Sequence, residues 1–282
     1  MSGVRWRRLV DRFWTVVCGT GVLLALVPLV SLLWLVVSRG LPGLSWRFFV
    51  ALPTPVGEPG GGVGNAVAGT FYMVGLACLA ALPVGIAGGV FLAERGDGRL
   101  GAAVRFVAEV LSGVPSIVVG IVAYGLLVVP MRRFSALAGA AALAILMVPP
   151  LTRATEEFVR LVPGTLREAS LALGIARWKT SLRIVLPTAF AGILTASLLA
   201  VARAAGETAP LLFTALNNQY WNFEADQPTG SLTVQIFNYA ISPYEEWHQK
   251  AWSAALVLLL LVGALNLLAR VLTRDRRPGV AR

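Results

Sequence analysis

The sequence has few charged residues, two cysteines and a single histidine. Of its 282 residues, 57% are hydrophobic and 13% are charged, and the mean hydropathy is +0.75. The charged share is about half that of a soluble domain. A soluble globule of this composition would expose large apolar patches, so the lipid bilayer is the expected solvent. The apolar content excludes disorder, and two cysteines inside apolar runs, Cys18 and Cys78, exclude a disulfide scaffold.

Catalytic and nucleotide-binding signatures are also missing. With His248 as the only histidine, a His-based metal site or triad is excluded. Residues 174–180 read GIARWKT, which lacks the glycine before the lysine of a phosphate-binding GxxxxGK[ST] loop and follows no strand. We therefore expect this chain to hydrolyse no ATP and to hold no cofactor or metal. The net charge of +10 comes from basic residues between apolar segments, which indicates membrane topology rather than nucleic-acid binding.

Six apolar segments are candidates for membrane spans, each of which needs about 20 mostly apolar residues. The first is interpreted as a membrane anchor rather than a signal peptide, because it is long and lacks a small-residue cleavage site. The predicted spans are Phe13–Val37, Ala66–Ala93 with Pro83 inside, Phe106–Val129 with Pro115 inside, Ala136–Leu151 ending at Pro149-Pro150, Ile184–Ala205 with a continuation to Leu216 left open, and Trp252–Val271. Six spans place both termini on one side of the membrane.

The basic residues predict which side this is. Eighteen lie on the side of the termini and five on the other, while Arg203 falls inside the fifth span. Because lysine and arginine concentrate in cytoplasmic loops, both termini are predicted to be cytoplasmic. The chain then divides into three parts. Residues 1–64 hold the N-terminus, first span and Pro/Gly-rich outer loop, residues 65–272 hold spans two to six, and residues 273–282 form a basic cytoplasmic tail.

Several local patterns predict packing rather than chemistry. Gly85 and Gly89 form a small-xxx-small pair suited to close helix packing. Glu109 follows Arg105 by one turn and is expected to form a surface ion pair with it. The outer loop 41–64, rich in proline and glycine, should be irregular. The aromatic residues of the outer loop 217–250 either anchor it at the membrane interface or form a docking surface for an external partner.

The charged cytoplasmic segment between spans four and five predicts two short helices. Residues 166–173 favour helix, and Gly174 can end that helix in a left-handed conformation. Arg177–Arg183 predicts a second, amphipathic helix, with Pro187 where the next span begins. The pair either rests on lipid headgroups or docks a cytoplasmic protein, and helical spacing alone leaves both alternatives open.

A spaced motif in this segment favours docking. Glu168-Ala169-Ser170 is followed by Gly174 after three residues, then by Ile184 and by Leu186-Pro187. This pattern resembles the EAA loop of ABC-importer permeases, from which it departs only at Ser170, where that family has alanine. The resemblance implies that Glu168, Ala169, Ser170 and Gly174 belong to a coupling helix, which sits in a cleft of a separate ATP-hydrolysing subunit.

Further segments resemble a narrower family, the PstA-type permeases of phosphate importers. They are residues 112–118 (SGVPSIV), 155–157 (TEE), 203–210 (RAAGETAP), 233–236 (TVQI) and the Pro/Gly-rich stretch 52–62. The resemblance implies an all-α integral membrane protein of the plasma membrane, with a MetI-like permease core over residues 65–272. It also implies three kinds of partner: a homologous PstC-like permease, two PstB-like ATPase subunits that bind ATP and Mg²⁺, and an extracytoplasmic phosphate-binding protein.

The ionisable residues inside the fifth span are candidates for the transport pathway, because charge in the bilayer is costly. Arg203 and Glu207 are four residues apart and are predicted to share one helix face. They are either an ion pair that allows insertion or an anion site in which Arg203 binds phosphate oxygens. Thr208 would add a hydroxyl. Pro115 and Ser116 are a second candidate lining, or an ordinary tolerated kink.

Three other functions compete with phosphate import. The EAA-like loop alone would suit a permease for another oxyanion or small solute. A membrane-bound sensor could use the same loop to bind a signalling partner without transport. A secondary transporter is disfavoured, because no clear inverted repeat is visible and the coupling loop would then have no role.

Overall fold

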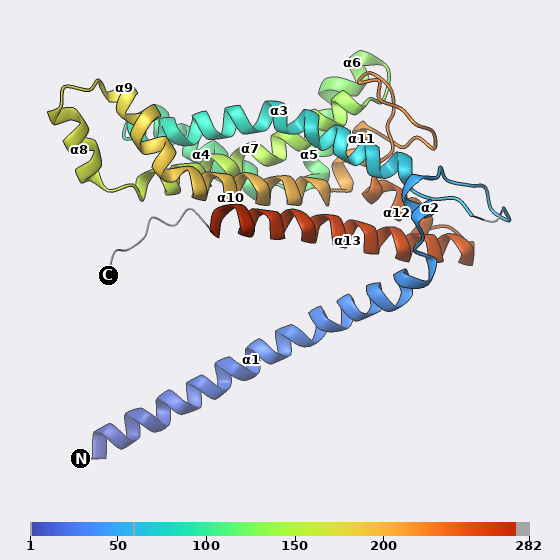
Figure 1. The fold of residues 1–282 in the computed structure, drawn as a ribbon, viewed down its shortest axis with the longest axis horizontal. Helices are drawn as coiled ribbons and strands as arrows, with labels where there is room; N and C mark the ends of the chain where they lie inside the picture. Colours follow the sequence, from blue (N-terminus) through green and yellow to red (C-terminus); the bar gives the residue numbers. More distant parts are fainter. Residues whose placement is uncertain (1, 59, 275–282) are drawn as a thin grey trace.

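The computed structural model describes residues 2–58 and 60–274, and all regular structure in this part of the chain is helical (Figure 1). The long helices are α1 (Ser2–Gly40), α3 (Gly64–Arg95), α7 (Ala136–Arg160), α10 (Leu186–Ala205) and α13 (Glu245–Arg274). The shorter ones are α2 (Trp46–Val50), α4 (Arg99–Gly113), α5 (Ser116–Ala123), α6 (Val129–Met131), α8 (Gly164–Ala172), α9 (Arg177–Thr180), α11 (Ala209–Thr214) and α12 (Leu232–Ala240). A 3₁₀ turn, η1 (Leu41–Gly43), and two π-helical turns, η2 (Tyr124–Val128) and η3 (Ser181–Val185), link them. Pro59 of the predicted irregular loop and residues 275–282 of the predicted tail lie outside the described residues.

Five helices are long and apolar enough to cross a bilayer, which confirms a multi-pass membrane fold. They cover Trp6–Gly43, Gly64–Arg95, Ala136–Arg160, Arg177–Ala205 and Glu245–Leu272. The third predicted span is not one helix, since Arg99–Gly113 and Ser116–Met131 meet at 104°. Pro115 lacks an N–H and disfavours helical backbone at Val114, which is extended, so α4 ends there. Six candidate crossings remain, five as helices and one as a broken pair.

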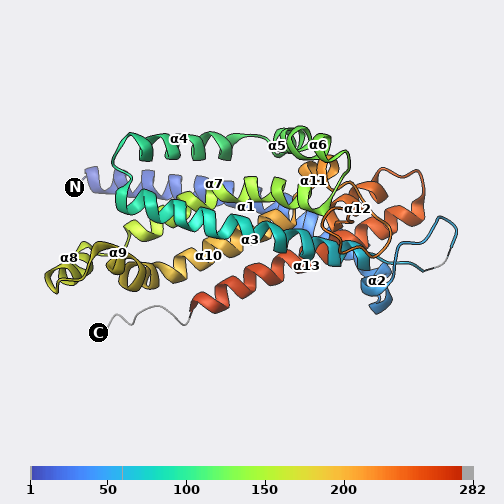
Figure 2. The same ribbon diagram turned by 90° about the horizontal axis from the view of Figure 1, so that it is seen from above.

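The helix pair α3 and α7 forms the centre of the bundle (Figure 2). A Cβ atom on Gly85 would lie 2.8 Å from the Leu151 side chain, and one on Gly89 would lie 2.6 Å from the Thr152 carbonyl oxygen. The glycines therefore allow a close approach of the two helices, as predicted. Next to this contact, buried side chains of α3, α7 and α10, many of them alanines, form an apolar core with residues of α11 and α12.

The fourth span is longer than predicted. We expected it to end at Pro149-Pro150, yet α7 continues to Arg160. Each proline removes one helical hydrogen bond at a cost of about 3 kcal/mol. The close packing of Leu151 and Thr155 against the glycines of α3 holds the helix together beyond that point. Here tertiary packing outweighs the helix-breaking tendency of proline.

Two other prolines follow π-helical turns. The Leu186 N–H donates to the Ser181 carbonyl just before Pro187, and the Val129 N–H donates to the Tyr124 carbonyl just before Pro130. The wider turn relieves the clash of a proline ring with the carbonyl four residues earlier. A separate helix over Arg177–Arg183 and a span beginning at Ile184 were therefore wrong predictions, since the helix runs without a break from Arg177 to Ala205.

The first helix begins and the last helix ends at the same end of the bundle. α1 starts and α13 finishes on the side that carries α8, whereas α2 and α12 lie at the other end (Figures 1 and 2). α1 leans away from the bundle and is fastened near its C-terminal end (Figure 1). There Ser253 Oγ donates to the Gly40 carbonyl at 3.0 Å, and Gln249 Nε2 donates to the Arg39 carbonyl at 2.7 Å. Which end faces the cytoplasm stays a prediction from the arginine distribution.

A buried carboxylate joins α4 to α7. Glu156 is 3% exposed and pairs with Arg105 at 2.7 Å, Arg153 at 3.2 Å and Arg160 at 3.0 Å. The predicted pair between Arg105 and Glu109 does not form, because Arg105 reaches across to α7 and Glu109 pairs with Arg153 at 3.0 Å. Arg105 and Glu109 of α4 therefore each form an ion pair with a residue of α7, and not with each other.

Arg105 also caps the end of α3. Its Nη1 donates to the Gly96 carbonyl at 2.8 Å and its Nη2 to the Leu92 carbonyl at 3.0 Å. Carbonyls at the end of a helix lack partners within the helix, and a cation there also interacts favourably with the helix dipole. One arginine therefore connects three helices at this end of the bundle.

The glycine contact generates a first prediction. Gly89→Leu should destabilise the purified protein in detergent, because overpacking costs about 1–3 kcal/mol and the backbone of α7 blocks the new side chain. Gly75→Leu is the matched control on the same helix, since nothing lies within 4 Å of its added Cβ. Thermal unfolding monitored by size-exclusion chromatography measures both. Equal melting temperatures would contradict the packing role of Gly89.

The ionic network generates a second prediction. Glu156→Ala should lower the free energy of unfolding by about 2 kcal/mol or more, because three arginines lose their shared buried partner. Glu109→Ala removes an exposed partner of Arg153 and should cost less than about 1 kcal/mol. The same unfolding measurement compares the two variants, and a larger loss for Glu109→Ala would refute the assignment.

Candidate functional site

The predicted pathway charge lies where α10 ends. Arg203 occupies the last turn of α10, at the end opposite α8, and its side chain is 61% exposed. Its Nε lies 3.6 Å from Glu207 Oε1, beyond hydrogen-bonding distance, whereas the Glu207 side chain is only 15% exposed. The predicted shared helix face is wrong in detail, because the helix ends at Ala205 and Glu207 lies in the following turn. Arg203 and Glu207 nevertheless lie close together, as expected from their spacing. The Arg203 guanidinium has N–H donors available for another partner.

Glu207 is held in place from a distant part of the chain. The Thr233 hydroxyl, at the start of α12, donates to the Glu207 backbone carbonyl at 2.8 Å. Behind it, Gln235 is buried and its Oε1 accepts from Asn217 Nδ2 at 2.9 Å. Thr233 and Gln235 belong to a stretch that sequence reasoning noted only for its family resemblance. The structure shows that this stretch supports the turn that carries the carboxylate.

The two predicted linings adjoin each other. Pro115 and Ser116 begin α5, and Thr208 precedes α11. α5 packs against α11 so closely that a Cβ on Gly120 would lie 2.7 Å from the Pro210 Cα. The break in the third span and the break after α10 therefore lie in one region of the protein. Broken helices expose backbone polar groups, which membrane proteins tolerate where a segment is buried or lines an aqueous cavity.

The predicted coupling segment forms a helix at the other end of the bundle. α8 exposes Glu168 and Ala169, and Gly174 ends the turn after it with φ of +76°, the left-handed conformation predicted for it. Ser170, the departure from the family motif, is buried and its Oγ lies 2.8 Å from Thr180 Oγ1. The serine hydroxyl thus ties α8 to α9, which alanine could not do. One face of α8 is therefore exposed, while Ser170 on its other face bonds α9.

A second contact anchors α8, and sequence reasoning missed it. Arg167 Nε donates to Glu94 Oε1 at the end of α3 at 3.2 Å, and the other Glu94 oxygen accepts from Ser181 Oγ at 3.1 Å. Arg167 also donates to the Val159 and Val162 carbonyls at 2.8 and 2.7 Å. Glu94 therefore joins α3, α8 and η3. Its partners are 73 and 87 residues away in the chain, so no local pattern marks them.

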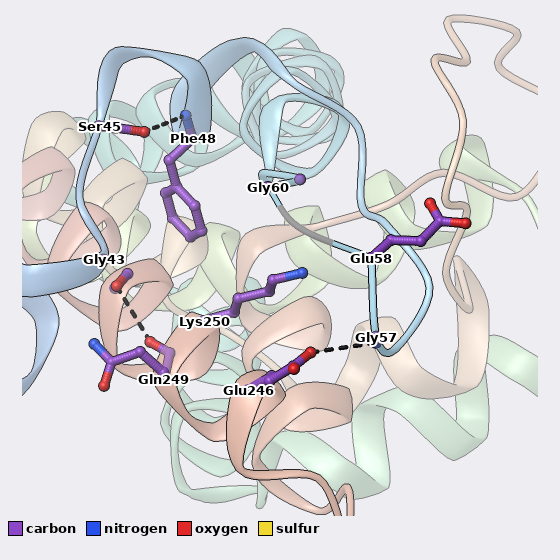
Figure 3. Close-up of a pocket in the computed structure, with 11 residues that line it drawn as sticks. Gly43, Ser45, Phe48, Gly57, Glu58, Gly60, Glu246, Gln249 and Lys250 are labelled. Carbon is purple, nitrogen blue, oxygen red and sulfur yellow. Dashed lines mark hydrogen bonds between the residues drawn. The ribbon is translucent and has the colours of Figure 1, made fainter.

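A pocket of about 520 Å³ lies at the opposite end, between the loop after α2 and the first turns of α13 (Figure 3). Lys250 Nζ donates to Thr54 Oγ1 at 2.9 Å, and the Gly57 N–H donates to Glu246 Oε2 at 3.3 Å. These bonds fasten the loop onto α13. The outer loop 41–64 was predicted to be irregular throughout, but it contains η1 and α2, and of its described residues mainly the part after α2 is irregular. Two carboxylates, Glu58 and Glu246, share the pocket with Lys250, so it does not concentrate positive charge for an anion. Among the residues described, no three His, Cys, Asp or Glu side chains gather as a metal site.

Known proteins with similar sequences are permease components of transport systems. The family described as "Binding-protein-dependent transport system inner membrane component" matches residues 85–278. The phosphate transport system permease protein PstA of Yersinia pestis is 42% identical over 273 residues, which cover 96% of this chain and 92% of that protein. PstA of Xylella fastidiosa strain 9a5c is 46% identical over 245 residues, covering 86% and 85%. The probable PstA of Methanocaldococcus jannaschii is 36% identical and covers 95% of both chains.

Solved structures share the fold at low sequence identity. A chain of the bacterial alginate ABC transporter, in complex with an alginate-bound periplasmic protein, aligns with a TM-score of 0.68 at 13% identity, covering 94% of this chain and 95% of that one. A chain of the inward-facing MetNI methionine transporter aligns with a TM-score of 0.60 at 20% identity, covering 76% and 93%. These two show an ABC-permease fold, and the closer sequence relatives narrow the family. The chain therefore belongs to the binding-protein-dependent inner membrane transport components and, among them, to the PstA family of phosphate transport permeases.

Proposed function

We propose that this chain is the permease subunit of an ATP-driven importer of inorganic phosphate and forms half of the translocation pathway. The observation that carries the proposal is the similarity to PstA proteins, which reaches 42% identity over 96% of the chain. The exposed guanidinium of Arg203 fits the anion, because arginine stays charged and donates two parallel hydrogen bonds to phosphate oxygens. Residues 65–272 act as the permease domain, with both termini in the cytoplasm.

The proposal assigns the other tasks to partner subunits. A homologous PstC-like permease completes a heterodimer, two PstB-like subunits bind and hydrolyse ATP with Mg²⁺, and an extracytoplasmic binding protein delivers phosphate. This chain holds no cofactor and catalyses no reaction of its own. It contacts lipid along its spans and binds no nucleic acid. The breaks at Pro115-Ser116 and at Thr208 line the pathway beside Arg203 and Glu207.

The geometry supports a mechanism for coupling. The exposed face of α8, with Glu168 and Ala169, receives the movement of the ATPase, and Arg167 passes it to α3 through Glu94. Ser170 passes it to α9, the first turn of the helix that ends at Ala205. Arg203 lies 26 residues after Arg177 on that helix, about 39 Å away at 1.5 Å per residue. A tilt started at α8 therefore moves the guanidinium and changes access to it.

The anion role of Arg203 gives a third prediction. Arg203→Gln should lower phosphate uptake about ten-fold or more, because a charge-assisted hydrogen bond contributes about 1.5–3 kcal/mol. Uptake of radiolabelled phosphate is measured in cells that lack their own importer and carry this chain with its partners. Arg133→Gln, which breaks an exposed pair with Asp226, is the control and should keep uptake within about two-fold. Unchanged uptake in an assembled Arg203→Gln complex would leave Arg203 as a structural ion pair.

The coupling role of α8 gives a fourth prediction. Glu168→Ala and Gly174→Ala should abolish phosphate-stimulated ATP hydrolysis, the first by removing an exposed docking charge and the second by straining a backbone with φ of +76°. Glu157→Ala removes an exposed carboxylate at the same end but outside α8 and should leave the stimulation intact. The reconstituted complex is assayed with and without phosphate. Normal stimulation in both α8 variants would eliminate this segment as the coupling element.

A further inference from the structure

A groove runs between the second half of α3 and the first turns of the helix that begins at Arg177. It encloses about 520 Å³, and its walls are mostly apolar. The apolar lining consists of residues of α3 on one side and of the helix that begins at Arg177 on the other: Pro83, Ile86, Ala87, Val90 and Phe91, and Leu182 and Leu186. Three of these lining residues, Ile86, Val90 and Leu186, pack against the buried cluster that joins α7 to α10. The groove is therefore a formed, concave apolar surface. The elements that line it, the second half of α3 and the helix that follows α9, lie toward the end of the bundle that carries α8 (Figures 1 and 2).

The dimensions of the groove match one leaflet of a bilayer. Its wall on α3 extends about 18 Å from Pro83 to Arg95 at 1.5 Å per helical residue, of which the apolar part, from Pro83 to Phe91, takes about 12 Å. Half of a hydrocarbon core is about 15 Å thick. The apolar part thus fits within one leaflet, and the polar end lies where headgroups would be.

The polar end combines an interfacial aromatic residue with unpaired positive charge. Trp178 lines the groove there, and the ammonium of Lys179 lies 5.4 Å from its ring centroid. Arg95 is exposed and makes no side-chain hydrogen bond or ion pair with any residue that the structure describes. The only acid in the groove, Glu94, is already bound by Arg167 and Ser181. An anion at this end therefore meets the Arg95 guanidinium and no free carboxylate, and Lys179 adds a second cation beside Trp178, at the rim of the groove.

We propose that this groove binds an anionic phospholipid, with one acyl chain between α3 and η3, the headgroup phosphate against Arg95, and Lys179 as a second cation at the rim beside Trp178. Basic pockets between helices bind anionic headgroups, and tryptophan favours the headgroup level of a membrane. A free phosphate ion would use the cations but leave the apolar groove empty. The bound lipid lies against Glu94, which holds Arg167 of α8, and against Ser181, which bonds the same carboxylate, so the lipid and the coupling segment contact the same residue.

The test uses the full chain in its assembled complex, reconstituted into phosphatidylcholine vesicles with a minor fraction of photoactivatable phosphatidylglycerol. Mass spectrometry maps the cross-linked peptides, and unlabelled phosphatidylglycerol, phosphatidylcholine and inorganic phosphate compete. We expect labels on α3 and η3 that phosphatidylglycerol displaces at least about five-fold better than phosphatidylcholine. Inorganic phosphate should displace none. This readout does not depend on phosphate transport.

Variants separate the two parts of the site. Arg95→Gln and Lys179→Gln should each lower the preference for phosphatidylglycerol about five-fold, the factor equivalent to about 1 kcal/mol per basic residue near an anionic surface. Arg183→Gln, on the same helix, neither lines the groove nor contacts the Trp178 ring as Lys179 does, and it should keep the preference. Ala87→Trp fills the groove and should abolish labelling there, whereas Val84→Trp, exposed on α3 outside the groove, should not. Co-purification of the partner subunits checks that each variant assembles.

Three results would overturn the proposal. Equal competition by the two lipids would make the groove an ordinary lipid-facing surface. Displacement by inorganic phosphate would make its polar end an anion site. Cross-links from a photoreactive amino acid at Leu182 to a partner subunit would show that protein, not lipid, covers the groove.

Discussion

The close approach of α3 and α7 at Gly85 and Gly89 sets the position of most other features. Helices in lipid gain little from burying apolar surface, so close backbone packing at small residues has to hold them together. The contact brings Glu156 of α7 within reach of Arg105, which in turn caps α3. It also places Glu94, at the end of α3, beside the segment that follows α7. The α8 anchor and the apolar groove are both consequences of that placement.

The prolines show what the sequence predicts and what it does not. Each one correctly marks a place where a regular helix is under strain. The outcome differs from place to place: the helix breaks at Pro115, continues through Pro149 and Pro150, and widens before Pro130 and Pro187. The difference depends on neighbouring helices, since α7 is buried against them both before and after its prolines. The positions of the prolines show where a helix is strained, but only tertiary packing determines whether it breaks, continues or widens there.

The same division holds for the candidate site. Four-residue spacing correctly brings Arg203 near Glu207, and the lack of a side chain correctly predicts the left-handed turn at Gly174. Local spacing also carries part of the Glu156 network, because Arg153 and Arg160 lie three and four residues away. The contacts of Glu94 and Thr233 join segments far apart in the chain. No local rule reaches them, because they depend on how whole helices dock.

The burial of α7 has a consequence for how the protein is made. This helix carries two prolines and a buried glutamate, and its surface is covered by other helices more fully than that of the other long helices. Alone in lipid, such a segment would expose backbone and charge to hydrocarbon. Two of the helices that pack on it, α3 and α4, precede it in the chain and are synthesised first, whereas α10 follows it. When α7 enters the membrane, α3 and α4 are therefore already present as a surface on which it can pack. This matters because α7 is the long helix least suited to insert alone.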